Sequence, residues 1–233
     1  MPLLTPFDLF GLVFFIAAWV LYHVLTERHG SAAHSLTASM NRARVAWMLN
    51  MAERDNRIVD TGIMNSLQSG TAFFASTSLI AVGGAAALLR AADDALKIFA
   101  DLPFGFATSR GLWELKVLGL VGIFGYAFFK FSWAYRVFNY AAILVGATPP
   151  ARIGDAETRR QAALRAARMN IAAARHFSHG QRAFFFALAY LGWFVGPAVF
   201  IAMTAAVLYV MWARQFRSDA RAAVLLEDDR GSA

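Results

Sequence analysis

The sequence predicts an all-α membrane protein: a bundle of four transmembrane helices with amphipathic helices on its cytoplasmic side. The 233 residues are 58% hydrophobic and only 16% charged, whereas a typical soluble domain is about 25% charged. Uncharged apolar runs recur along the chain, each close to the roughly 20 residues that a membrane-spanning helix needs. The net charge of +7 fits arginine-rich cytoplasmic loops beside anionic lipid, so nucleic acid need not be invoked as a partner.

We expect one membrane domain over residues 1–233. Its four spans are predicted at about 7–25, 65–89, 112–146 and 184–212. A continuous third helix would be about 50 Å long, against a hydrocarbon core of about 30 Å, so it extends past the membrane. Close packing of this helix is predicted from three glycines, Gly119, Gly122 and Gly125. Gly196 followed by Pro197 predicts a kink in the fourth span.

Amphipathic helices are predicted in the two long loops, at about 36–57 and 156–182, and a short one near 91–100. The apolar face of the first consists of Leu36, Met40, Ala43, Trp47 and Met51. This helix either lies in the membrane interface or packs on the protein's own cytoplasmic helices. The second repeats an arginine every seven residues. Positive-inside bias explains this stripe, and an anion or lipid-headgroup site is the alternative.

The distribution of basic residues predicts the orientation. No Lys or Arg precedes the first span, and arginines are most numerous after the first and third spans. Both termini are therefore expected outside the cytoplasm, with the two long loops inside. Arg214 and Arg217, directly after the last span, argue the other way. The expected location is the inner membrane of a bacterium, because the alanine and arginine content is typical of a GC-rich bacterial genome.

Charged residues at the cytoplasmic ends of the spans form the candidate site. Helix length places Lys130 near the inner membrane boundary and Arg136 beyond it, with Asp55 and Asp60 as their expected acidic partners. The candidate polar or anion-binding residues are Arg42, Arg44, Arg54, Asp55, Arg57, Asp60, Lys130, Arg136, Asn139, Arg168, Arg175, His179 and Arg182. Such a set either binds an anion or headgroup, or holds the loops to the spans.

Motifs for cofactor or enzyme chemistry are sparse. The absence of cysteine excludes disulfides and thiolate-ligated metals. His176 and His179 are three residues apart and could share a metal, but no acidic residue stands at a matching spacing as a third ligand. His23 could form a haem pair with one of them. No cofactor is assigned from these patterns, and the sequence contains no nucleotide-binding or hydrolase motif.

Several separate motifs carry a resemblance to a known family. They include residues 40–48 (MNRARVAWM), 54–60 (RDNRIVD), 73–78 (FFASTS), 131–133 (FSW) and 180–197. These motifs resemble a bacterial and plant family of integral membrane proteins, catalogued as domain of unknown function 599. The resemblance implies a four-span protein with cytoplasmic loops. It supplies no catalytic residues and no established activity.

The function predicted from these observations is a structural or interaction role. We expect a membrane scaffold or accessory subunit whose cytoplasmic face binds anionic lipid or a protein partner, which includes a further copy of the chain. Two alternatives remain: a small oligomeric transporter or channel, and a membrane-embedded enzyme that modifies lipid or performs redox chemistry.

Overall fold

The computed structural model describes residues 4–27, 35–100, 109–152 and 155–228, and within these ranges the fold is all-α. In chain order the helices are α1 (Pro6–Glu27), α2 (Leu36–Ala52), α3 (Ile58–Arg90), α4 (Ala92–Ala100), α5 (Arg110–Ala147), α6 (Ala156–Val195), α7 (Pro197–Phe216) and α8 (Asp219–Asp228). The predicted fold class is confirmed. The short helix expected near 91–100 is α4.

Local sequence explains where three of these helices begin. The side chains of Ser35, Ser109 and Asp155 each accept a hydrogen bond from the backbone N–H three residues later. Ser and Asp are favoured at this position because their oxygen satisfies an N–H that has no partner inside the helix. The starts of α2, α5 and α6 are therefore encoded locally.

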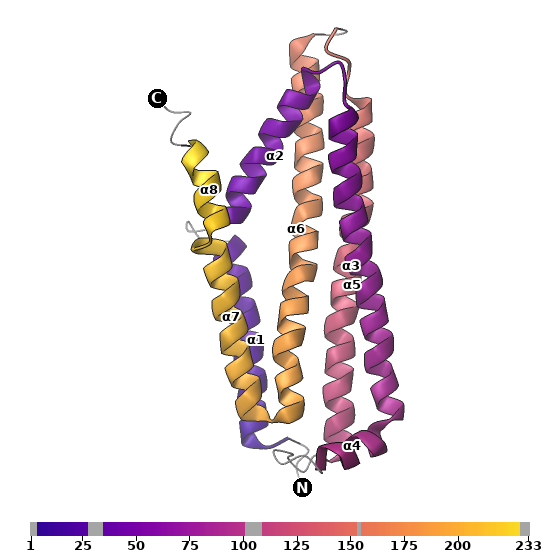
Figure 1. The fold of residues 1–233 in the computed structure, drawn as a ribbon, viewed down its shortest axis with the longest axis vertical. Helices are drawn as coiled ribbons and strands as arrows, with labels where there is room; N and C mark the ends of the chain where they lie inside the picture. The colour runs from indigo at the N-terminus through magenta and orange to yellow at the C-terminus, as the bar shows by residue number, and fades with distance from the viewer. Residues whose placement is uncertain (1–3, 28–34, 101–108, 153–154, 229–233) are drawn as a thin grey trace.

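Helix lengths divide the molecule into two layers. Helices α1 and α7 have 22 and 20 residues, which gives about 33 and 30 Å, the thickness of a hydrocarbon core. Helices α3, α5 and α6 have 33, 38 and 40 residues, or about 50 to 60 Å. Figure 1 shows α1 and α7 beside one half of these long helices, which we call the membrane layer. Helix α2 lies beside the other half, the projecting layer.

Four helical segments are long and apolar enough to cross a membrane. They are Pro6–Glu27, Ile58–Arg90, Arg110–Ala147 and Pro197–Val224. Large apolar side chains on them face outward, including Phe10 (58% exposed), Ile80 (76%) and Phe129 (72%). An apolar surface of this extent indicates contact with lipid. The chain is therefore a multi-pass membrane protein.

The predicted fourth span at 184–212 is wrong as a single helix. Helix α6 continues from the projecting layer through the membrane layer to Val195, and the chain reverses at Gly196 into α7 (Figure 1). Pro197 lacks the N–H that would continue α6, yet it suits the first turn of α7. Gly196 has an extended backbone, with φ 162° and ψ 162°. The uncharged run thus holds a hairpin where the sequence indicated a kink.

This hairpin adds one crossing of the membrane layer to the four candidate spans. Helix α1 begins at the end of the membrane layer that is far from the projecting layer, whereas α8 contacts α2 in the projecting layer (Figure 1). The two ends of the described chain therefore lie on opposite sides of the membrane layer. The expectation of both termini outside the cytoplasm assumed a single helix over 184–212, and the hairpin does not support that assumption.

The two layers have different cores. In the membrane layer, aromatic side chains dominate: Trp19 stacks on Phe186 with ring centroids 4.8 Å apart, and Trp193 stacks on Phe200 at 5.5 Å. In the projecting layer the core of α2, α3, α5 and α6 is rich in alanine and methionine, and Met48 is fully buried in it. Helix α2 therefore packs on the protein's own helices, which confirms one of the two predicted alternatives.

Close packing at glycine is more local than predicted. A β-carbon on Gly119 would collide with the Tyr190 hydroxyl, and one on Gly180 would lie 2.7 Å from the Phe131 ring. No atom lies within 4 Å of the corresponding position at Gly122 or Gly125. Of these three glycines of α5, only Gly119 has an atom of another helix within 4 Å of its β-carbon position.

Candidate functional site

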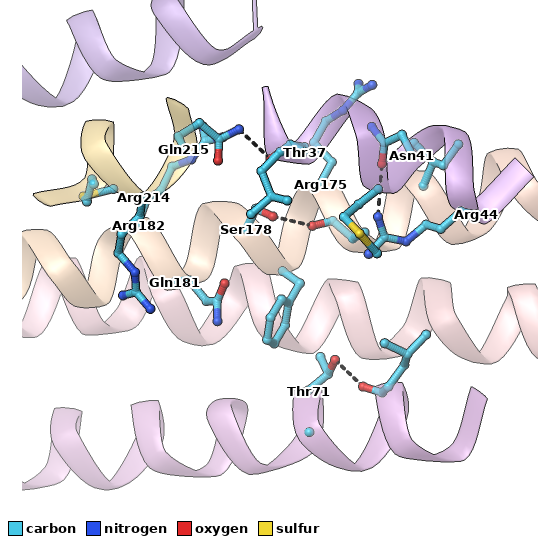
Figure 2. A pocket seen from close by; sticks show the side chains of 18 of the residues that line it. Thr37, Asn41, Arg44, Thr71, Arg175, Ser178, Gln181, Arg182, Arg214 and Gln215 are labelled. Atoms are coloured by element: carbon cyan, nitrogen blue, oxygen red, sulfur yellow. Dashed lines mark hydrogen bonds between the residues drawn. The ribbon is translucent and has the colours of Figure 1, made fainter. Parts of the chain in front are cut away.

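A cavity of about 530 Å³ lies where the two layers meet. Its walls come from α2, α3, α5, α6 and α7 (Figure 2), and Tyr22 of α1 also lines it. Four arginines line it: Arg44 of α2, Arg175 and Arg182 of α6, and Arg214 of α7. No carboxylate is among the described residues that line it. The cavity is therefore strongly cationic.

Helix geometry explains this convergence of arginines. Arg175 and Arg182 are seven residues apart, so they share a face of α6. Arg214 lies in the last turn of α7, next to Gln215, whose side-chain amide donates to the Thr37 hydroxyl of α2 at 2.8 Å. This hydrogen bond joins α7 to α2 along the cavity wall (Figure 2). The α6–α7 reversal is thus what brings Arg214 to the site.

The arginines are held largely by groups that do not neutralise them. Arg44 donates to the Asn41 side-chain oxygen at 3.2 Å, and Arg214 lies over the Phe185 ring at 5.7 Å. Burial lowers the pKa of Arg44 from its usual value. Among the described residues, Arg44, Arg175 and Arg214 form no ion pair. Three positive charges therefore line the cavity, and no acidic side chain in the described part of the chain pairs with them.

Arg182 is the exception, because it has an acidic partner. Its Nη1 lies 3.2 Å from Oε1 of Glu27, and its guanidinium lies over the Tyr22 ring at 5.3 Å. Glu27 is not among the lining residues. The remaining wall carries apolar side chains, among them Phe138 and Phe177. A concave surface with guanidinium groups and aromatic rings is suited to an anionic headgroup attached to an apolar chain.

Asp60 belongs to a separate cluster in the projecting layer. It is fully buried and accepts hydrogen bonds from Trp47 Nε1 at 2.7 Å and from Arg54 Nη1 at 3.2 Å. Asp55 pairs with Arg152 at 2.8 Å. The expected partnership of these two aspartates with Lys130 and Arg136 is therefore wrong.

Lys130 and Arg136 of α5 both contact aromatic rings of their own helix. Lys130 lies over the Tyr126 ring at 5.2 Å. Arg136 donates to the Tyr140 hydroxyl at 2.7 Å and lies over the Trp133 ring at 5.9 Å. Arg136 is exposed, whereas Lys130 is half-buried and lies near His176 and His179 of α6.

The other predicted site residues have structural contacts away from the cavity. Arg57 donates to the carbonyls of Val145, Thr148 and Pro149, where α5 ends, and a cation suits that end of a helix. Asn139 accepts from Gln68 at 2.8 Å. Arg42 donates to Ser39 at 3.0 Å, and the exposed Arg168 donates to the Leu164 carbonyl at 3.3 Å. Of the thirteen candidates, Arg44, Arg175 and Arg182 line the cavity.

His179, the remaining candidate, lies in a histidine cluster next to the cavity. Its Nε2 contacts Oε1 of Glu27, and the same oxygen lies 3.5 Å from His23 Nδ1. The sequence offered no third ligand for a metal, and the fold brings Glu27 of α1 to that place. Burial lowers the pKa of both His179 and His176 below the usual histidine value.

A further polar network, not anticipated from the sequence, lies at the outer end of the membrane layer. Lys116 is buried and donates to the Trp193 carbonyl at 2.7 Å. The indole N–H of Trp193 donates to buried Asp8 at 2.7 Å. These bonds tie α1, α5 and α6 together. Their groups are satisfied by one another, which is typical of a structural role.

The fold and the cavity define a multi-pass helical membrane protein with a cationic site at the junction of its layers. Residues 10–220 match the family model described as "Protein of unknown function, DUF599". The chain therefore belongs to this family, as the resemblance predicted. The comparisons with curated proteins and with solved structures found no match.

Proposed function

We propose that this protein is a membrane scaffold or accessory subunit that binds the headgroup of an anionic lipid in the arginine-lined cavity. The observation that carries the proposal is the charge of that cavity. Four arginines line about 530 Å³, with no carboxylate among the described lining residues and apolar side chains beside them. Guanidinium groups bind phosphate with paired, charge-assisted hydrogen bonds.

The level of the cavity supports a lipid as the source of the phosphate. Tyr22 and Arg182 lie near the end of α1, and Arg214 lies near the end of α7. These two helices are as long as a hydrocarbon core is thick. The cavity is therefore at the depth of a headgroup layer, where an acyl chain can reach the apolar wall.

Charge distribution supports a position of the cavity in the cytoplasmic headgroup layer. Of the 22 Lys and Arg residues, those near the junction of α3 and α5 are only four: Arg90, Lys97, Arg110 and Lys116. With the end of α7 on the projecting side, Arg214 and Arg217 no longer conflict with the positive-inside rule. The outer end of α1 then faces away from the cytoplasm, and the projecting layer with α8 faces the cytoplasm. Anionic lipid is concentrated in that leaflet.

A binding measurement on purified protein tests the proposal. Each arginine near an anionic surface contributes about 1 kcal/mol, which corresponds to roughly fivefold in affinity. We expect Arg44→Gln and Arg214→Gln each to weaken binding of phosphatidylglycerol or cardiolipin by about fivefold. Native mass spectrometry in mild detergent measures the bound fraction. Arg168→Gln is the matched control, because Arg168 is an exposed arginine of α6 outside the cavity.

A second arm separates lipid from free phosphate. Inorganic phosphate at equal concentration should displace little lipid, because it offers nothing to the apolar wall. Equal weakening by Arg168→Gln would mean that the net charge of the protein attracts lipid without a site, and it would refute the proposal. Phosphate binding with no preference for the lipid would refute the lipid as the ligand.

A further inference from the structure

His23, Glu27 and His179 bring three metal-ligating groups together at the inner end of α1. Their ligand atoms all lie within 4.8 Å of one another. His23 and Glu27 are four residues apart, so they share a face of α1, and His179 comes from α6. The histidine rings are 5.3 Å apart at 65°, and the Glu27 carboxylate lies against a nitrogen of each. This space fits a small ion rather than a haem plane.

An unsatisfied nitrogen lies beside this group. Nδ1 of His176 is buried and has no hydrogen-bond partner among the described residues. The His176 ring centroid is 6.2 Å from that of His179, one turn earlier on α6. A buried polar atom without a partner is uncommon in a native fold and calls for a ligand or water. A third imidazole is thus available next to the three clustered groups.

We propose that His23, Glu27 and His179 bind a divalent first-row transition metal, with Zn²⁺ as the best match. Two imidazoles and one carboxylate form a common zinc ligand set with an open coordination position, and the same set binds Fe²⁺ in other proteins. Ligands that share one tetrahedral zinc lie roughly 3.3–3.5 Å apart, given bonds of about 2.0–2.2 Å. Oε1 of Glu27 is already 3.5 Å from His23 Nδ1, and its shorter contact with His179 would lengthen when a metal binds. His176 is the nearest candidate for the open position.

Arg182 competes with the metal for Glu27. Its Nη1 lies 3.2 Å from the same carboxylate oxygen that contacts both histidines. The competing interpretation of the cluster is an ion pair that joins α1 to α6. The two interpretations differ in what they predict for removal of Arg182. If the cluster is an ion pair, removal of Arg182 weakens it. If the cluster is a metal site, removal of Arg182 takes away a cation that repels the metal.

Equilibrium dialysis against Zn²⁺, with the metal counted by mass spectrometry, tests the site. Any affinity tag used for purification is removed first, so that it cannot bind the metal. Co²⁺ provides a second readout through its visible absorption bands. We expect one ion per chain. His23→Ala and His179→Ala should each weaken binding about a hundredfold or more, since loss of even an outer-shell group costs about 10–100-fold. Arg182→Gln should bind Zn²⁺ at least as tightly as the unaltered chain.

The chain supplies its own control. It has five histidines, and the other two, His29 and His34, lie outside the described residues. The double variant His29→Ala/His34→Ala should keep one ion per chain. The proposal fails if that variant loses the metal, if His23→Ala keeps it, or if Arg182→Gln loses it. The His23 side chain is 45% exposed, so its variant stays informative where His179→Ala does not fold. Arg44→Gln reports on the lipid proposal alone, because Arg44 is outside this cluster.

Discussion

At the scale of single residues, Asp60 shows why burial and not charge alone decides a partnership. Its carboxylate is fully buried between α2 and α3 and accepts bonds from Trp47 and Arg54. One of its oxygens, Oδ2, has no partner among the described residues. Asp55, five residues earlier, pairs with Arg152 at the surface. Two nearby aspartates thus contribute very differently to the stability of the projecting layer.

We predict that Asp60→Ala lowers the free energy of unfolding by about 2 kcal/mol, because it leaves the half-buried Trp47 N–H without its partner. Arg54 is 46% exposed, so solvent screens its share. For a chain of this size the change corresponds to a fall in Tm of roughly 4–8 °C. Thermal unfolding in detergent measures it. Asp55→Ala is the control, with an expected change of at most about 1 kcal/mol. Equal effects of the two variants would contradict the assignment.

At the scale of helices, α5 and α6 pack closely where a glycine lies opposite a large ring. Tyr190 fills the space over Gly119. It has no room to move, because its ring packs against Phe15 at 5.6 Å, Trp193 at 5.5 Å and Phe200 at 5.7 Å. The spacing of three glycines in α5 predicted close packing but could not show which of them faces α6.

Gly119→Ala should therefore destabilise the protein by about 1–3 kcal/mol through overpacking. Gly122→Ala, one turn further along α5, adds a methyl group to open space. It should be neutral or stabilise the helix by up to about 1 kcal/mol, since alanine is the better helix former. Tm measurements on both variants test whether Gly119, and not Gly122, packs against α6. A drop in Tm for Gly122→Ala of the same size would mean that α5 and α6 pack differently.

At the scale of the whole molecule, the α6–α7 hairpin determines which groups share a side of the membrane. Fold class, the first three spans and the helices α2 and α4 follow from hydrophobic periodicity, and they were predictable. The reversal at Gly196 was not, because no charge interrupts the apolar run from Ala183 to Ala213 and the glycine–proline pair is equally typical of a kink.

The candidate site, like the fold, was predictable only in the part that depends on spacing within one helix. Arg175 and Arg182 share a helix face, and this could be inferred from their spacing. Arg214 could not be placed beside them, because its position depends on the hairpin. Glu27 stands one turn after His23 on the same helix, yet its approach to His179 is a tertiary contact between α1 and α6. Local spacing carries no information about such contacts.

The orientation can be tested directly because the chain has no cysteine. Single cysteines at Lys97, Arg168 and Asp219 would occupy exposed positions on α4, α6 and α8. We predict that a membrane-impermeant maleimide labels Lys97→Cys in intact cells. Arg168→Cys and Asp219→Cys should react only after the membrane is permeabilised. Labelling of both Lys97→Cys and Asp219→Cys in intact cells would place α4 and α8 on one side of the membrane and contradict the hairpin topology. Labelling of Asp219→Cys but not Lys97→Cys would keep the hairpin and reverse the proposed orientation.

The central claim is that the arginine-lined cavity binds an anionic lipid headgroup. Its most direct test is an experimental structure of the protein in nanodiscs that contain phosphatidylglycerol or cardiolipin. We predict a phosphate within hydrogen-bond distance of at least two of Arg44, Arg175, Arg182 and Arg214, with an acyl chain along the apolar wall. A cavity that holds only water in anionic nanodiscs, with lipid phosphates elsewhere on the surface, would contradict the claim.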